Sequence, residues 1–235
     1  MAAFALKVGG VVPFTATDYP GKLAAVVFVQ GCPWRCGYCH NPHLQARQAY
    51  SAVAWPEVHK LLARRVGLID AVVFSGGEPT IDPALPDAVA QVRAMGFEVG
   101  LHTACIYPRQ LGTVLPQLDW VGFDVKAPFD DYARVTRIAD SGRHARACAE
   151  MIIASGVAHE CRTTVHPDLL GDDELEALAA TLAGMGVRNY ALQMFRAQGC
   201  GDAALAARAV ARAPAPQALA RIGAMFPQFT LRQAA

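Results

Sequence analysis

The sequence predicts a single α/β domain built on a parallel sheet, which is either open or curved into part of a barrel. Three observations lead to this expectation. The 235 residues are near the upper end of what one domain usually holds. Six short apolar segments alternate with segments of helical periodicity, a pattern typical of right-handed βαβ units. No internal repeat and no shift in composition marks a second domain.

The predicted strands are short runs of apolar and β-branched residues. The first run, LAAVVFV, is continuous and ends at Gly31, which is typical of a fully buried strand. The second, AVVF, is broken by Gly76-Gly77. The six predicted strands cover 23–29, 71–74, 97–101, 120–125, 161–165 and 190–195.

The predicted helices fill the intervals between these strands. The first begins near Pro56, a residue that suits a helix start. Asp173 followed by Glu176 resembles a capping box at the start of a later helix. After residue 202 the chain is rich in Ala and Arg and predicts helix, broken at Pro214 and Pro216. The other helical segments cover about 85–96, 108–116 and 143–155.

The composition excludes several classes of protein. Hydrophobic residues make up 53% of the chain and charged residues 17%, which excludes a disordered chain. The formal charge of +1 lacks the basic excess of a nucleic-acid-binding protein. The longest apolar run, Leu23 to Val29, is too short to span a membrane. Residues 1–20 contain one cation, Lys7, and no long apolar core, so we expect no signal peptide and a cytoplasmic location.

Polar residues gather where the predicted strands end. Because parallel strands place their carboxyl ends at one mouth, we expect the ligand site there. The polar groups are Cys32 to His40 after the first strand, Ser75 to Pro79 after the second, His102-Thr103 after the third, Asp124 to Lys126 ending the fourth, His166 after the fifth and Gln193 in the sixth.

Three of the seven cysteines form a cluster in the sequence. Cys32, Cys36 and Cys39 have the spacing Cx3Cx2C, whereas an odd and unevenly spread set argues against a secreted disulfide framework. Three thiolates on one loop suit three irons of a cubane cluster and leave the fourth iron open. A zinc site would need His40 as fourth ligand, and its place next to Cys39 gives poor tetrahedral geometry. The spacing therefore predicts a 4Fe–4S cluster with an open iron.

The cysteine segment resembles the signature of the radical S-adenosylmethionine (SAM) superfamily, with Tyr38 before the last cysteine. Gly76-Gly77-Glu78-Pro79 is similar to the Gly-Gly-Glu-Pro motif of that superfamily, and Asp124-Val125-Lys126 to the Asp-x-Lys element of glycyl-radical-enzyme activases. Asp18-Tyr19-Pro20-Gly21-Lys22 and the Cys-His-Asn-Pro at 39–42 are similar to the second group of anaerobic ribonucleotide reductase activating proteins.

The resemblance runs from about residue 11 to 200 and implies the architecture. We expect residues 1–235 to form one radical SAM domain, an incomplete (β/α)6 barrel of parallel strands, with a helical C-terminal extension over 202–235.

The resemblance also implies the cofactors and their ligands. Cys32, Cys36 and Cys39 would hold the 4Fe–4S cluster, and the open iron would take the amino and carboxylate groups of SAM. Gly76 and Gly77 would let the backbone approach that ligand. The remaining expected cofactor-binding residues are Glu78 for the methionyl ammonium, Lys126 for the carboxylate, Tyr38 against the adenine, His166 and Gln193 toward the ribose or adenine, Asp124 as ligand or cation holder, and His40.

One motif departs from the family pattern. Pyruvate formate-lyase activases have Asp-Thr-Asn-Gly after the third strand, and that aspartate helps to hold a monovalent cation. This chain has His102-Thr103-Ala104-Cys105 instead. The departure argues against the cation, which is the third cofactor that the resemblance implies, and against a pyruvate formate-lyase target.

The expected activity is reductive cleavage of SAM, with formation of a glycyl radical on anaerobic ribonucleoside-triphosphate reductase. The expected partners are that protein and an electron donor such as flavodoxin or ferredoxin. Two alternatives stay open at this point. One is a radical SAM enzyme with another substrate, either another glycyl radical enzyme or a small molecule such as a deazaguanine precursor. The other is a non-catalytic iron–sulfur or zinc binding module.

Overall fold

A computed structural model describes residues 5–208 and 213–233 of the chain. Its centre is one eight-stranded sheet in which the strands follow each other in chain order, so β1 and β8 form the two edges and the sheet is unclosed. β1 is antiparallel to β2, and every later pair is parallel. The strands are β1 Val8–Thr15, β2 Ala24–Val29, β3 Ala71–Gly76, β4 Glu98–Thr103, β5 Trp120–Asp124, β6 Ala158–Val165, β7 Asn189–Met194 and β8 Gln228–Arg232.

The sheet contains all six predicted strands and two more at its edges. β1 (VGGVVPFT) was not predicted because its glycines and proline interrupt the strand pattern, and three of its residues are exposed. β8 (QFTLR) is five residues long and half-buried, so its alternation is too short to stand out. The predicted helical extension over 202–235 is therefore corrected, because it ends in a strand that pairs with β7.

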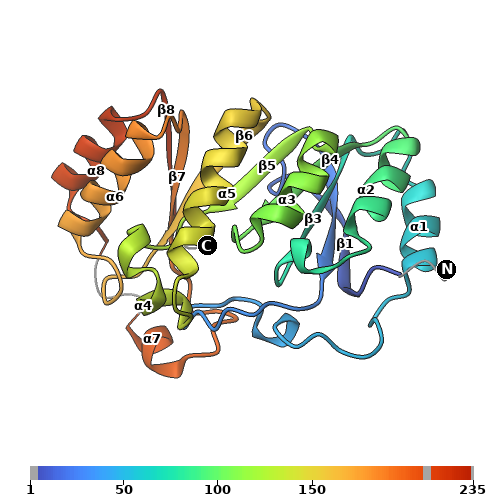
Figure 1. Cartoon of the computed structure of the whole chain (residues 1–235), viewed down its shortest axis with the longest axis horizontal. Coiled ribbons are helices and arrows are strands. Elements are labelled where there is room, and N and C mark those ends of the chain that lie inside the picture. Colours follow the sequence, from blue (N-terminus) through green and yellow to red (C-terminus); the bar gives the residue numbers. More distant parts are fainter. Residues whose placement is uncertain (1–4, 209–212, 234–235) are drawn as a thin grey trace.

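The helices are α1 Trp55–Ala63, α2 Leu85–Ala94, α3 Pro108–Val114, α4 Ala133–Thr136, α5 Ser141–Ser155, α6 Asp172–Gly184, α7 Ala203–Ala207 and α8 Pro216–Ala224. All of them except α4 and α7 lie along one face of the sheet (Figure 1). The predicted capping box of α6 is wrong by two residues: Gly171 is the N-cap, and its N–H donates to the Glu174 carboxylate over 2.9 Å. Glu176 pairs instead with Arg221 of α8.

Both faces of the sheet are buried, which explains why its strands are continuous apolar runs. Alternate residues such as Val27 and Phe74 belong to the large core beneath the helices. On the inner face, Tyr19 and Trp120 pack against Ala24, Val26, Ala71 and Val73. The loop between β1 and β2 therefore fills the inside of the partial barrel.

None of the helices in the described part of the chain combines the length and the apolar character that crossing a membrane would require.

The segments that follow the carboxyl ends of the strands gather at one end of the molecule. The cysteine segment, α4 and α7 lie there together (Figure 1). Tyr132, just before α4, accepts a hydrogen bond from the Lys126 N–H at 3.0 Å and thereby fixes the chain after β5. The first turn of α5 packs tightly on this segment, because a Cβ at Gly142 would lie 1.8 Å from the Phe129 carbonyl oxygen.

We expect Gly142→Ala to destabilise the protein by about 1–3 kcal/mol, because backbone must move to admit the methyl group. Gly184→Ala is the matched control, since a Cβ there meets no atom within 4 Å. It should stabilise the protein by up to about 1 kcal/mol through helix propensity. Urea unfolding followed by circular dichroism measures both. Equal effects of the two variants would contradict the tight contact at Gly142.

Candidate active site

One cavity at the carboxyl ends of the strands contains most of the predicted site. It brings together residues that are distant in sequence, from the cysteine loop and from the ends of β3, β5 and β7. The predicted residues that line it are Cys32, Cys36, Tyr38, Cys39, His40, Gly76, Gly77, Asp124, Lys126 and Gln193. Glu78 and His166 are not among its lining residues.

The cysteine loop is anchored at its beginning by backbone hydrogen bonds. Gly31 N–H donates to Leu44 O over 2.8 Å and Cys32 N–H to Gln45 O over 3.0 Å, which closes the loop. The three thiols are partly exposed toward the cavity. Burial raises the pKa of Cys32 to about 12 and also raises that of Cys36, where the charge of Lys126 counteracts it. Both thiols are protonated near neutral pH without a metal, so metal binding must displace their protons.

Gly76 and Gly77 bring the end of β3 against the start of the cysteine loop. Gly76 has a φ of +129°, and a Cβ on it would lie 2.3 Å from Val29 O. A Cβ on Gly77 would lie 2.4 Å from Gly31 O. The sequence predicted close approach of a ligand here, and the structure shows close approach of the chain's own backbone.

Glu78 is fully buried and joins the ends of β3 and β4. Its carboxylate accepts hydrogen bonds from the Thr80 N–H and hydroxyl, from the Thr103 hydroxyl at 2.9 Å and from the Ala104 N–H at 2.8 Å. Burial raises its pKa, although the hydrogen bonds oppose this. In this arrangement the carboxylate holds the two strand ends together.

Asp124 and Lys126 form an ion pair in the cavity wall. The Lys126 Nζ lies 2.9 Å from Asp124 Oδ2, and the lysine side chain is 10% exposed. Burial disfavours the ammonium, but the charge of Asp124 outweighs it and raises the lysine pKa. The same Nζ lies 5.5 Å from the centre of the Tyr38 ring. The Tyr38 hydroxyl is buried and has no hydrogen-bond partner, so a polar atom is left for a ligand.

The two predicted histidines differ in their surroundings. His40 lines the cavity, stacks on Phe195 and places Nε2 3.1 Å from Arg196 O; burial lowers its pKa. His166 is fully buried, with Nε2 3.1 Å from Leu205 O and Nδ1 accepting from the Asp168 N–H. His166 therefore holds the segment that includes α7.

The cavity also contains residues that the sequence did not single out. Arg162 and Thr164 alternate along β6 and both line it, together with Arg196. The period of two was visible in the strand sequence CRTTV, where a charged residue inside a buried strand was the available signal. Cys105, Cys148 and Cys161 are buried, and Cys200 places its sulfur 3.4 Å from Gly37 O in the cysteine loop.

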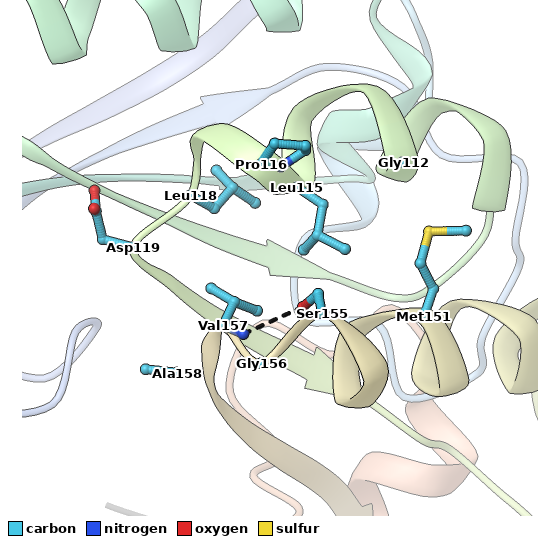
Figure 2. Close-up of a pocket in the computed structure, with 10 residues that line it drawn as sticks. All are labelled: Gly112, Leu115, Pro116, Leu118, Asp119, Met151, Ser155, Gly156, Val157 and Ala158. Atoms are coloured by element: carbon cyan, nitrogen blue, oxygen red, sulfur yellow. Dashed lines mark hydrogen bonds between the residues drawn. The ribbon is translucent and has the colours of Figure 1, made fainter.

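A second pocket lies at the opposite end of the sheet, near the starts of β5 and β6 (Figure 2). Its walls are mainly apolar side chains such as Leu115, Leu118 and Met151. Its one carboxylate, Asp119, already accepts hydrogen bonds from Arg93 and from the Val99 N–H. This pocket offers no group that is free for catalysis.

The donor set of the main cavity fits a three-thiolate iron–sulfur cluster beside a small polar ligand. Three thiols project from one loop, while an ammonium and an unpartnered phenol lie on the same cavity. Among the described residues, no three His, Cys, Asp or Glu side chains converge as a single metal ion would require. Soft thiolates with an open fourth position suit a cubane cluster.

His102 makes the stability of the fold depend on pH. Burial and the charge of Arg162 lower its pKa to about 3, against about 6.5 in the unfolded chain. Between these two pH values only the unfolded state binds the proton. The contribution of the neutral His102 to the free energy of unfolding is therefore fully present above pH 6.5 and is lost as the pH falls. Cluster-free wild-type protein should lose free energy of unfolding between pH 6.5 and 4.5, and His102→Asn should make this loss smaller by about 2 kcal/mol.

Urea unfolding at four pH values measures this effect. His144→Asn, at an exposed position on α5, is the control and should follow the wild-type curve. Parallel pH profiles for wild type and His102→Asn would contradict a neutral His102 in the folded state.

The sequence comparisons agree with this site. Residues 26–182 match the Radical SAM superfamily. A protein of Methanocaldococcus jannaschii named "Putative glycyl-radical enzyme activating enzyme" is 30% identical over 208 residues, which cover 83% of this chain and 82% of that protein. The pyruvate formate-lyase-activating enzyme of Clostridium pasteurianum is 34% identical over 119 residues, covering 48% of this chain and 50% of that enzyme.

The fold comparisons agree as well. SuiB of Streptococcus suis, bound to its precursor peptide, superposes with a TM-score of 0.66 at 11% identity over 88% of this chain and 48% of SuiB, so the chain spans about half of that protein. QueE from Escherichia coli gives a TM-score of 0.53 at 15% identity over 98% of this chain and 94% of QueE. At these identities the likeness concerns the fold. By its matched domain and its curated relatives, the chain belongs to the radical SAM superfamily, among the glycyl-radical enzyme activating enzymes.

Proposed function

We propose that this protein generates a glycyl radical on an anaerobic ribonucleoside-triphosphate reductase. In the overall reaction, SAM and one electron yield methionine and 5′-deoxyadenosine, while a glycine of the target protein loses one hydrogen atom. Superfamily membership implies a 4Fe–4S cluster and SAM. The observation that carries the proposal is the convergence of Cys32, Cys36 and Cys39 with the Asp124–Lys126 pair on one cavity.

The three cysteines would hold the cluster, which when bound supplies the electron for cleavage of SAM. Lys126 would pair with the carboxylate of SAM. Asp124 holds the ammonium of Lys126 in place through the 2.9 Å contact. Tyr38, whose hydroxyl lacks a partner, would lie against the adenine. Gln193 and His40, which also line the cavity, would contact the nucleoside.

Two of the expected SAM ligands are assigned different roles in this proposal. Glu78 would act as a positioning residue, because its carboxylate already accepts bonds from the end of β4. The ammonium of SAM would then meet backbone oxygens of the Gly76-Gly77 turn. His166 would position the segment that includes α7, since its ring nitrogens are taken up by Leu205 O and the Asp168 N–H.

The motif Asp18-Tyr19-Pro20-Gly21-Lys22 and the residue His102 support the reductase as the target. Tyr19 of that motif donates to Glu98 over 2.9 Å and packs on Trp120, so the motif fills the inside of the partial barrel below the cavity. The Asp18 carbonyl lies 2.8 Å from His102 Nε2. This motif is similar to reductase activases, and His102 departs from the pyruvate formate-lyase type.

We propose one domain over 1–235, with the radical SAM core at about 11–200 and an extension at 202–235. A protein substrate would lie across the mouth of the cavity, near exposed Arg196. The proposed electron donor is flavodoxin or ferredoxin, and the proposed location is the cytoplasm. A monovalent cation would have to bind at Asp124, where Lys126 already contacts one carboxylate oxygen.

Cys36→Ala should abolish cluster assembly, because two thiolates do not retain a cubane. Anaerobic reconstitution followed by iron, sulfide and zinc analysis measures this. The wild type should hold about four irons per chain, and Cys36→Ala close to none. Cys148→Ala, a buried cysteine of α5 outside the cavity, should keep the wild-type iron content. Unchanged iron in Cys36→Ala would contradict Cys36 as a cluster ligand, and one zinc per chain in place of iron would favour the binding-module alternative.

The activity is tested by anaerobic EPR of the reduced, reconstituted protein mixed with SAM and an anaerobic ribonucleotide reductase. We expect a glycyl-radical doublet on the reductase and one 5′-deoxyadenosine per radical. A parallel mixture with pyruvate formate-lyase should give no doublet. A doublet only on pyruvate formate-lyase would refute the proposed target and keep the activase reaction. Absence of both the doublets and 5′-deoxyadenosine would refute the reaction itself.

A further inference from the structure

The wall of the cavity beside Asp124 has an excess of positive charge. Among the described residues that line the cavity, Asp124 is the one carboxylate, whereas Lys126, Arg162 and Arg196 bring three cations. Lys126 contacts Asp124 directly, and Arg162 stands opposite Asp124 in the register between β5 and β6. Loss of hydration disfavours the carboxylate, but the charges of Lys126 and Arg162 outweigh it and lower its pKa.

Arg162 is held in place from several sides. Its Nε donates to Glu160 Oε1 over 2.8 Å, and its guanidinium lies 5.1 Å above the Trp120 ring. Gly122 leaves the room for it, because a Cβ there would lie 2.6 Å from Arg162 Nη2. The side chain is 10% exposed. A guanidinium fixed in this way is a permanent charge of the cavity.

Glu160 also binds a second arginine, so its single negative charge is shared between two guanidinium groups. Arg232 of β8 binds both carboxylate oxygens of Glu160, each over 2.8 Å. The three residues together keep a net charge of +1, and the guanidinium of Arg162 is the member that lines the cavity.

His102 does not supply the missing negative charge. Its Nε2 lies 2.8 Å from Asp18 O and 3.3 Å from Arg162 Nη2. The ring is neutral at physiological pH. An alkali cation would need several oxygen ligands, and the one carboxylate among the described residues that line the cavity, Asp124, is already in contact with Lys126. The cation that the family resemblance implies therefore does not fit this wall.

We propose that Arg162 supplies, as a fixed part of the chain, the positive charge that an exchangeable cation would otherwise bring to the cavity, so that binding of SAM is independent of alkali cations. This inference rests on the proposed cofactor-binding role of the cavity. Arg162 would act on the carboxylate of SAM through Asp124 and Lys126, so it is a positioning residue. Glu160 and Arg232 keep it in place.

The test is equilibrium binding of SAM to the anaerobically reconstituted protein in KCl, NaCl and choline chloride at constant ionic strength. The wild type should bind SAM equally in the three salts, within about twofold. Arg162→Gln should bind about tenfold more weakly in choline chloride, and KCl should restore part of the affinity. Arg162→Lys keeps the charge and should remain independent of the salt. Arg109→Gln, at an exposed position on α3, should behave as the wild type.

Two results would overturn the inference. One is a wild-type affinity for SAM that is severalfold higher in KCl or NaCl than in choline chloride. The other is Arg162→Gln that binds SAM as the wild type does in every salt.

The melting temperature of the cluster-free protein gives a readout that does not depend on SAM. It should be the same in KCl and choline chloride for the wild type, and higher in KCl for Arg162→Gln. If the loaded wild type binds no SAM in any salt, the proposed function fails, while this comparison still decides the role of Arg162. Stabilisation of the wild type by K⁺ over choline would refute the inference.

Discussion

A close backbone contact joins the end of β3 to the start of the cysteine loop, and the rest of the site depends on it. Glu78 N–H donates to Gly31 O over 2.8 Å and Gly77 N–H to Val29 O over 3.0 Å. Gly76 and Gly77 make this approach possible, because a Cβ on either of them would collide with the backbone of the facing segment. The Glu78 side chain then extends this contact to the end of β4. The positions of the cysteine thiols relative to the sheet depend on this junction, and so does the shape of the cavity between them and Lys126.

The sequence predicted the parts of this structure that have a local signal. The central strands are continuous apolar runs because both faces of the sheet are covered, and Cx3Cx2C places three thiols on one loop. Arg162 escaped prediction because its place in the cavity depends on the register that sets it opposite Asp124. The bonds of Glu78 to Thr103 and Ala104 also arise from tertiary contact between two strand ends, and no spacing in the sequence encodes them.

The two strands at the edges of the sheet connect to the site from opposite sides. The loop after β1 brings Asp18 to His102 and Tyr19 to Trp120. β8 brings Arg232 to Glu160, which holds Arg162. His102, Trp120 and Arg162 are in mutual contact, with the guanidinium above one ring and beside the other. Elements that the sequence did not predict thus support the charged wall of the cavity, and this arrangement fixes charge where a bound ion would be exchangeable.

Mössbauer spectroscopy of the protein reconstituted with ⁵⁷Fe, recorded with and without SAM, tests most directly whether this cavity holds a three-thiolate cluster with an open iron. We expect one 4Fe–4S cluster per chain, in which SAM changes the isomer shift of about one quarter of the iron, because a single iron lacks a protein ligand. A spectrum that SAM leaves unchanged would contradict an open iron that takes SAM as its ligand.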